Sequence, residues 1–143
     1  MTKVTASTRS ISATEIARSW HLIDVKNKVL GREAPGIASL LQGKGKIAYA
    51  PYLDAGDFVV VVNAKNIKVT GKKMDQKEYQ YYSGYPGGQR RVPYKRMLAD
   101  KPEEIIKRAV SGMLPKNKLR DPRMSRLYIF ADATHPYSDK FVK

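Results

Sequence analysis

Two glycines, Gly31 and Gly36, have the spacing of a P-loop, the turn in which backbone N–H groups cradle nucleotide phosphates. A P-loop continues with a lysine that reaches the phosphates and with a Ser or Thr that holds Mg²⁺. Here the next two residues are Ile37 and Ala38, so neither group is present. The glycine spacing is therefore better explained by a turn that starts a helix than by a nucleotide site.

Asp54 and Asp57 form a second candidate, a pair of carboxylates that could share acid and base roles in catalysis. They precede an apolar run, in a segment where aspartates commonly shape turns. The chain has no cysteine, and neither His21 nor His135 belongs to a cluster of metal-ligating residues. We therefore predict a protein that is not an enzyme and binds no metal.

Positive charge is the strongest chemical signal in the chain. The 143 residues include 27 Lys and Arg against 13 Asp and Glu, which gives a formal net charge of +14. A soluble domain of this size usually carries a net charge of about 2 to 8. The excess favours an anionic partner: nucleic acid, an anionic membrane surface or an acidic protein. The alternative interpretation is that these lysines are ordinary solvated surface residues. It explains a single lysine better than it explains several clusters.

The basic residues gather in clusters, mostly where loops and helix ends are expected. A glycine beside a lysine lets the backbone approach a phosphate while the ammonium group neutralises it. The basic residues of the last cluster, which runs from Lys116 to Arg126, are expected to project from an exposed loop and a short helix. The candidate phosphate contacts are Lys44, Lys46, Lys72, Lys73, Arg90, Arg91, Lys116, Lys118, Arg120, Arg123 and Arg126.

Tyrosines lie among these clusters, at Tyr79, Tyr81, Tyr82 and Tyr85. An aromatic ring beside basic side chains can stack on an unpaired nucleic-acid base. Alternate tyrosines of a strand can also pack into a core, and for any one of them packing is the preferred interpretation.

Strand and helix patterns alternate along the chain. Apolar, β-branched and aromatic residues predict strands at 20–25, 58–62, 78–83 and 127–130. The run at 58–62 is apolar throughout, which is typical of a strand covered on both faces. A shorter strand is expected at 67–70 and a loop at 85–88. Strands that alternate with helices predict an α/β domain with a largely parallel sheet.

The first helix is expected to begin near Ala34, because Pro35 fits only the first turn of a helix, and to end at Gly43. Its apolar face recurs at helical spacing at Leu30, Ala34, Ile37, Ala38 and Leu41.

The second helix is expected to begin at Pro102, with two acids in its first turn, and to end at Gly112. In a third helix, Asp121 is the expected cap and Pro122 the first residue. The predicted buried face of the second helix comprises Ile105, Ile106, Ala109, Val110 and Met113.

Short motifs in a fixed order resemble those of a known family. The most distinctive is the stretch 112–119, Gly-Met-Leu-Pro-Lys-Asn-Lys-Leu. Over about residues 20–136 the chain resembles the family of the universal large-subunit ribosomal protein numbered thirteen, in its bacterial and organellar form. It departs from the family pattern at Glu33, Pro35, Gly45 and Tyr82. The other matching motifs are Leu30-Gly31-Arg32, Leu41-Gln42-Gly43-Lys44, Tyr49-Ala50-Pro51, Asp54-Ala55-Gly56-Asp57, Asn63-Ala64, Thr70-Gly71-Lys72-Lys73, the glycine loop 83–88 and His135-Pro136.

The resemblance implies a three-layer α/β/α domain with a mainly parallel sheet at 20–136, between an N-terminal extension at 1–19 and a C-terminal tail at 137–143. It implies a structural constituent of the large ribosomal subunit that binds rRNA early in assembly through the basic clusters above. Other large-subunit proteins would be its neighbours, and the resemblance implies no cofactor and no small-molecule substrate. A free RNA-binding regulator is the alternative, and a nucleotide-dependent enzyme is a weaker one.

The expected location is the cytoplasm, on the ribosome. No membrane partner is expected, because the longest apolar run, 58–62, is far short of the roughly 20 residues that a membrane-spanning helix needs. The Ser- and Thr-rich start of the chain contains Arg9 and Arg18, which leaves the mitochondrial matrix as an alternative. Glu15 and the shortness of the segment argue against a transit peptide.

Overall fold

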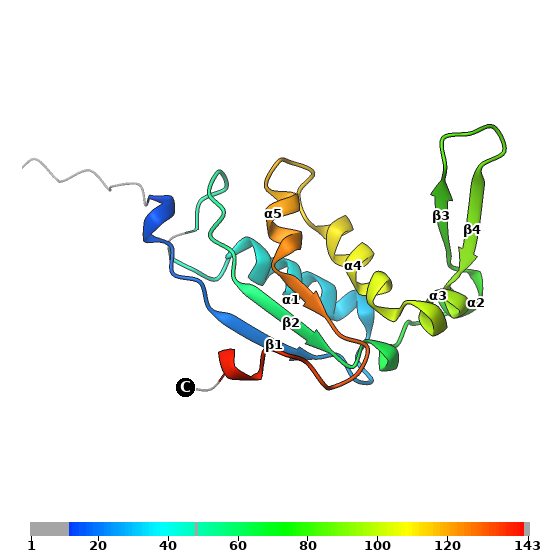
Figure 1. Ribbon diagram of the computed structural model, residues 1–143, viewed down its shortest axis with the longest axis horizontal. Coiled ribbons are helices and arrows are strands. Elements are labelled where there is room, and N and C mark those ends of the chain that lie inside the picture. Colours follow the sequence, from blue (N-terminus) through cyan, green and yellow to red (C-terminus); the bar gives the residue numbers. More distant parts are fainter. Residues whose placement is uncertain (1–11, 48, 142–143) are drawn as a thin grey trace, which may run out of the picture.

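A parallel sheet forms the centre of the fold. The computed structural model describes residues 12–47 and 49–141. The strands β1 (Trp20–Asp24), β2 (Phe58–Val62) and β5 (Leu127–Ile129) lie in the order β1-β2-β5, and both pairs are parallel (Figure 1). The middle strand β2 is covered on both faces, as its apolar run predicted, and Val59, Val60 and Val61 are fully buried.

Helices α1 (Leu30–Gln42) and α4 (Pro102–Met113) lie against one face of the sheet, together with the short helix α5 (Arg120–Ser125) (Figure 1). Their apolar side chains form the main core, in which Val59 and Val61 of β2 pack with Ile37 of α1 and with Ile105 and Val110 of α4. This arrangement confirms the predicted α/β class with a mainly parallel sheet.

Aromatic side chains cover the opposite face, where Phe58 and Val60 point because side chains alternate along a strand. Trp20 stacks on Phe58 with 4.5 Å between ring centroids, and Tyr137 and Phe141 lie 5.3 and 6.3 Å from Trp20. These last two residues flank the 3-10 helix η3 (Ser138–Lys140). Among the described residues, the layer on this face is therefore built by the C-terminal segment instead of an α-helix.

The first helix begins about one turn earlier than predicted. We expected a start near Ala34, but α1 begins at Leu30 and contains Pro35. A proline inside a helix removes one backbone hydrogen bond. Leu30, Ala34 and Ile37 are nevertheless buried on both sides of Pro35, so packing against the core outweighs the local cost. Gly43 ends the helix as predicted, with a left-handed φ of 74°.

An antiparallel hairpin, β3 (Glu78–Tyr82) and β4 (Gln89–Pro93), stands apart from the main sheet and projects from one end of the molecule (Figure 1). Helix α2 (Lys73–Gln76) precedes it and α3 (Tyr94–Asp100) follows it. The sequence predicted β3 and the loop at 85–88 but missed β4, which is too polar to show a strand pattern. The strand expected at 67–70 is wrong, because the segment forms only one parallel bridge, between Val29 and Lys68.

Helix α4 begins at Pro102 as predicted and runs one residue past Gly112. Ile105, Ile106 and Val110 are buried as predicted, whereas Ala109 is only partly buried and Met113 is 43% exposed. Helix α5 begins at Arg120, so Asp121 lies inside its first turn and is not the cap. Two further 3-10 helices, η1 (Ala13–Glu15) and η2 (Ala64–Asn66), precede β1 and follow β2.

Candidate nucleic-acid interface

The candidate phosphate contacts divide into two exposed groups and one enclosed group. The hairpin group (Lys72, Lys73, Arg90 and Arg91) lies on α2 and the β3–β4 hairpin, at the end of the molecule where α4 begins (Figure 1). The second group, which we name the α4–α5 group, lies where α4 ends and comprises exposed Lys44, Lys116 and Lys118 with half-buried Arg120. The enclosed group is Lys46, Arg123 and Arg126.

Lys72 and Lys73 lie in the turn that starts α2. Gly71 precedes them with a φ of 64°, a left-handed conformation that glycine adopts without steric cost. Both lysines line an open hollow of about 520 Å³. An ion pair of 2.6 Å between Asp75 of α2 and Lys95 of α3 joins these two short helices. The turn thus presents two ammonium groups beside accessible backbone, which suits a phosphate group.

A groove of about 490 Å³ lies between the hairpin and α3. Arg90 and Arg91 line it from β4, and Arg96 and Lys101 line it from α3 and the residue that follows. Tyr81 of β3 contributes an aromatic wall. The sequence predicted the two arginines of β4, and the fold adds two more cations to the same groove.

The loop after α4 leaves the core at Leu114, which is 2% exposed. The Asn117 side chain stabilises the loop by accepting a hydrogen bond of 3.1 Å from the Leu119 backbone N–H. Such a local turn fixes the backbone before a ligand arrives. Lys116 and Lys118, on either side of Asn117, are exposed.

Further basic side chains near α4 come from the end of α1 and from α4 itself. Lys44 follows the end of α1 and shares a hollow of about 440 Å³ with Met113 of α4. Lys107 is exposed on α4, and Arg108 is half-buried. The Arg108 guanidinium lies 4.2 Å from the ring centroid of Tyr81, so it joins α4 to the hairpin. Basic side chains therefore occur along α4 as well as at both of its ends.

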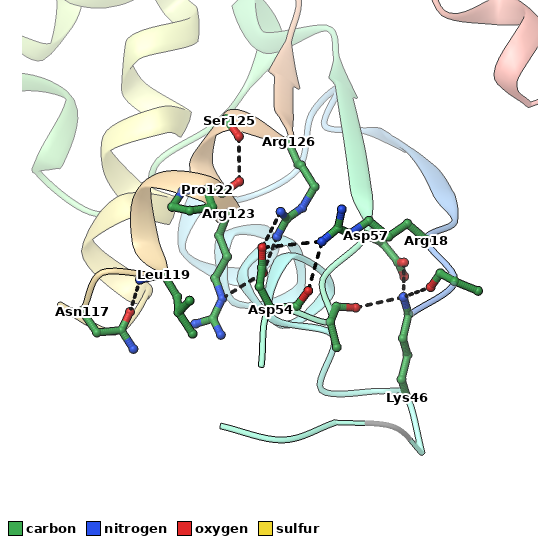
Figure 2. Close-up of polar contacts among 12 residues, drawn as sticks. Arg18, Lys46, Asp54, Asp57, Asn117, Leu119, Pro122, Arg123, Ser125 and Arg126 are labelled. Atoms are coloured by element: carbon green, nitrogen blue, oxygen red, sulfur yellow. Dashed lines mark hydrogen bonds and ion pairs between the residues drawn. The ribbon is translucent and has the colours of Figure 1, made fainter. Parts of the chain in front are cut away.

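The expectation that Arg123 and Arg126 project from the surface is wrong, since both are buried and Arg123 is only 2% exposed. Both guanidinium groups point at the carboxylate of Asp54, in the loop before β2 (Figure 2). Arg126 contacts both oxygens, at 2.5 and 2.6 Å, and Arg123 Nε lies 3.6 Å from Oδ1. Arg18 adds a third cation, with Nη2 3.9 Å from Oδ2. These arginines hold α5 against the loop, and we do not count them as phosphate contacts.

Lys46 is also engaged inside the protein. Its Nζ forms an ion pair with Asp57 and donates hydrogen bonds to the carbonyl oxygens of Ala17 and Ala55, at 2.7 and 2.9 Å (Figure 2). Burial alone would raise the pKa of Asp57. The hydrogen bonds from Lys46, the Ser19 backbone N–H and His21 outweigh burial, so the pKa of this carboxyl is lowered. Lys46 thus joins the segment before β1 to the loop before β2.

The tyrosines among the basic residues have different roles. Tyr79 packs into the core, as preferred, and burial raises its pKa to about 12. Tyr82 and Tyr85 are 70% and 74% exposed near the hairpin tip, so the packing interpretation is wrong for them. Tyr81 is 39% exposed and forms part of the hairpin groove. Three of the four rings are thus accessible to a partner.

The two enzyme candidates of the sequence have structural explanations. Gly31 and Gly36 both lie inside α1 and form no phosphate-binding loop. Asp54 is engaged by Arg123 and Arg126, and Asp57 is engaged by Lys46 and by His21, whose Nε2 lies 2.9 Å from Oδ2. Over residues 12–47 and 49–141 no group of three or more His, Cys, Asp or Glu could hold a metal ion. In the same described ranges, no helix combines the length and the apolar character needed to cross a membrane.

Three contributors to this surface were missed in the sequence: Arg96 and Lys101 as groove cations, and Asp54 as the anchor of buried arginines. Arg96 and Lys101 depend on α3, which has no clear helical pattern in the sequence. The charge balance of the sequence could have indicated an acidic partner such as Asp54. The basic segment 107–126 contains a single acid, so a buried arginine in it needs a carboxylate from elsewhere in the chain.

Comparison with known proteins agrees with these observations. The model of the family described as "Ribosomal protein L13" matches residues 18–136. Large ribosomal subunit protein uL13 of Clostridioides difficile is 52% identical over 124 residues, which cover 87% of each chain. The protein of the same name from Syntrophotalea carbinolica is 48% identical over 132 residues, 92% of this chain and 93% of that one. The chain therefore belongs to the ribosomal protein L13 family.

Proposed function

We propose that this chain is a structural constituent of the large ribosomal subunit and that it binds large-subunit rRNA. The observation that carries the proposal is the family match over residues 18–136, together with relatives named as large-subunit proteins that align over nearly their full length. The family is a structural, non-enzymatic component of the ribosome, and the chain is accordingly not an enzyme.

The two exposed basic groups supply the chemistry for RNA binding. The hairpin group and the α4–α5 group present Lys and Arg side chains, which neutralise phosphates and release counterions when RNA binds. The enclosed cations Lys46, Arg123 and Arg126 act indirectly, because they fix α5 and the loop before β2, next to the α4–α5 group. This division between anchoring and contacting cations gives a rigid, electropositive surface with little ordering cost on binding.

We propose that binding occurs early in assembly. The domain has its own buried core between the sheet and α1 and α4, so it needs no other protein to fold before it meets RNA. Its neighbours in the finished subunit would be rRNA helices and other large-subunit proteins. The location follows from this partner: the ribosome, in the cytoplasm, or in the mitochondrial matrix for an organellar ribosome.

The direct test is sedimentation of the tagged chain through a sucrose gradient at moderate salt. We expect it to travel with the large subunit and to enter early precursor particles. Migration with free RNA outside the subunit would instead favour a regulator that acts off the ribosome. Migration alone, at the position of a small protein, would contradict RNA binding altogether.

A further inference from the structure

The groove between the β3–β4 hairpin and α3 has a composition that plain phosphate binding does not require. Its volume of about 490 Å³ lies in the range of sites for small molecules. Its lining combines the Tyr81 ring and the apolar side chains of Val92 and Met97 with four cations. Contacts to the outer phosphates of a duplex need the cations alone.

The pairing of the hairpin explains how an aromatic ring and a guanidinium come to face the groove together. Tyr81 of β3 lies directly opposite Arg90 of β4, and Tyr79 lies opposite Val92. Directly opposed residues of an antiparallel pair project to the same face. Tyr82 alternates with Tyr81 along β3 and does not line the groove.

The Tyr81 ring is fixed before any ligand arrives. Arg108 of α4 lies 4.2 Å from its ring centroid, and Arg108 is itself paired with Glu104, one turn away, at 3.7 Å. The Tyr81 hydroxyl also lies 4.0 Å from the sulfur of Met97. Arg108 occupies one face of the ring, and the remaining ring surface contributes to the groove wall.

The cations of the groove are available to an anion. Among the described residues, Arg90 and Lys101 have no ion pair or side-chain hydrogen bond. Asp100 is the only acid in the lining, and it is 3.5 Å from Arg96, one turn earlier in α3. An anionic group that enters the groove therefore meets two unengaged cations beside an aromatic wall.

We propose that this groove holds one unpaired nucleotide of RNA, with the base against Tyr81 and its phosphate at Arg90. This inference rests on the proposed function and names the RNA feature that this part of the surface recognises. Bases in an RNA duplex are stacked and enclosed, whereas a bulged or looped-out base can reach an aromatic wall. An acidic peptide would satisfy the cations but would leave the aromatic and apolar walls without a matching planar group.

The experiment compares two RNA stem-loops that differ by one unpaired adenosine, with the full chain as the protein. Stacking on an aromatic side chain increases affinity about tenfold or more per base. We expect the wild type to bind the bulged RNA about tenfold more tightly than the paired RNA at the same salt concentration. Replacement of the bulged base by 2-aminopurine should show a change in fluorescence on binding.

Variants on the hairpin separate stacking from charge and from folding. Tyr81→Leu should abolish the preference for the bulged RNA, Tyr81→Phe should keep it, and the exposed control Tyr82→Leu should leave it unchanged. Arg90→Gln should weaken binding to both RNAs and reduce the salt slope by about one. Melting temperatures of all variants show whether the fold is intact.

Equal affinity of the wild type for the two RNAs would overturn the nucleotide site and leave ribosomal rRNA binding standing. A preference that survives in Tyr81→Leu would overturn it too. Failure of the wild type both to bind RNA and to sediment with large subunits would remove the proposed function itself. In isolated subunits, an ultraviolet crosslink from Tyr81 to a nucleotide would support the site, and a crosslink to a peptide instead would overturn it.

Discussion

The Arg126 guanidinium meets the Asp54 carboxylate at two points, with 2.6 Å between Nη1 and Oδ2 and 2.5 Å between Nη2 and Oδ1. The two residues are 72 positions apart in the chain, so this contact closes a long loop. It joins the segment before β2 to the turn between α5 and β5 (Figure 2). The ion pair therefore sets the position of α5 and of the basic loop that leads into it.

Asp54→Asn should destabilise the protein by about 3 kcal/mol, because it leaves two buried guanidinium groups without a compensating charge. Urea unfolding at neutral pH measures this change. The matched control is Asp121→Asn, an exposed acid of α5, which should change stability by about 0.5 kcal/mol or less. Equal effects of the two substitutions would contradict the anchoring role of Asp54.

Gly56→Ala should destabilise the protein by about 1 to 3 kcal/mol through overpacking. A Cβ at this position would lie 1.8 Å from the Leu41 carbonyl oxygen and 3.0 Å from Arg126 Nη2, so the loop would have to move away from α1. Gly45→Ala is the control, because no atom lies within 4 Å of its Cβ position. Thermal melts of both variants test the prediction, and a normal melt for Gly56→Ala would contradict it.

Elements with a strong local signal were predictable from the sequence. Pro102 followed by two acids marked the start of α4, and the apolar run at 58–62 marked the central strand. Pro35 misled because local propensity favours a helix start there, while burial of Leu30 extends the helix by a turn. The hairpin strand β4 gave no pattern because it has no buried face of its own.

The candidate site was less predictable than the fold. Sequence alone identifies a cation but not its partner, so exposed Lys116 and buried Arg123 looked alike. The difference between them depends on Asp54, which is far away in the chain and meets Arg123 only after folding. The hairpin groove likewise depends on how β4 and α3 come together, which no local pattern specifies.

Acid should destabilise the wild type partly through Asp57. Its pKa is lowered in the folded protein, so the unfolded state binds the proton more readily. The contribution of the Asp57 charge to the free energy of unfolding is fully present above the ordinary aspartate pKa. It is lost as the pH falls through the lower pKa that Asp57 has in the folded protein. Asp57→Asn should therefore lose less stability than the wild type when urea unfolding is compared at pH 7 and pH 3. Identical losses would contradict a stabilising charge at this position.

Affinity for rRNA should depend steeply on salt. If about six phosphates are neutralised by the two exposed groups, affinity should fall roughly a thousandfold between 50 and 200 mM salt. Filter binding with a large-subunit rRNA fragment at several salt concentrations gives the slope. A nearly flat slope would show that phosphate contacts do not dominate the interface.

The loop between α4 and α5 offers the sharpest separation of RNA binding from folding. Lys116 and Lys118 are exposed and Arg120 is half-buried, and within the described part of the chain none of the three has an ion pair. Their joint replacement by Ala should therefore leave the melting temperature near that of the wild type. Each lost phosphate contact should lower the magnitude of the salt slope by about one, and incorporation into large subunits should be weak.

A control variant with the same loss of charge replaces Lys26, Lys65 and Lys140 by Ala. These three lysines are exposed in other parts of the chain. Lys65 gives up an exposed ion pair with Asp132, a contact that contributes at most about 1 kcal/mol. If net charge alone drove incorporation, both triple variants would fail equally. If the loop after α4 is the contact surface, only the first variant fails, because its backbone is held in place by buried Leu114 and by the Asn117 turn. Normal incorporation of the first variant would move the RNA surface to the hairpin group.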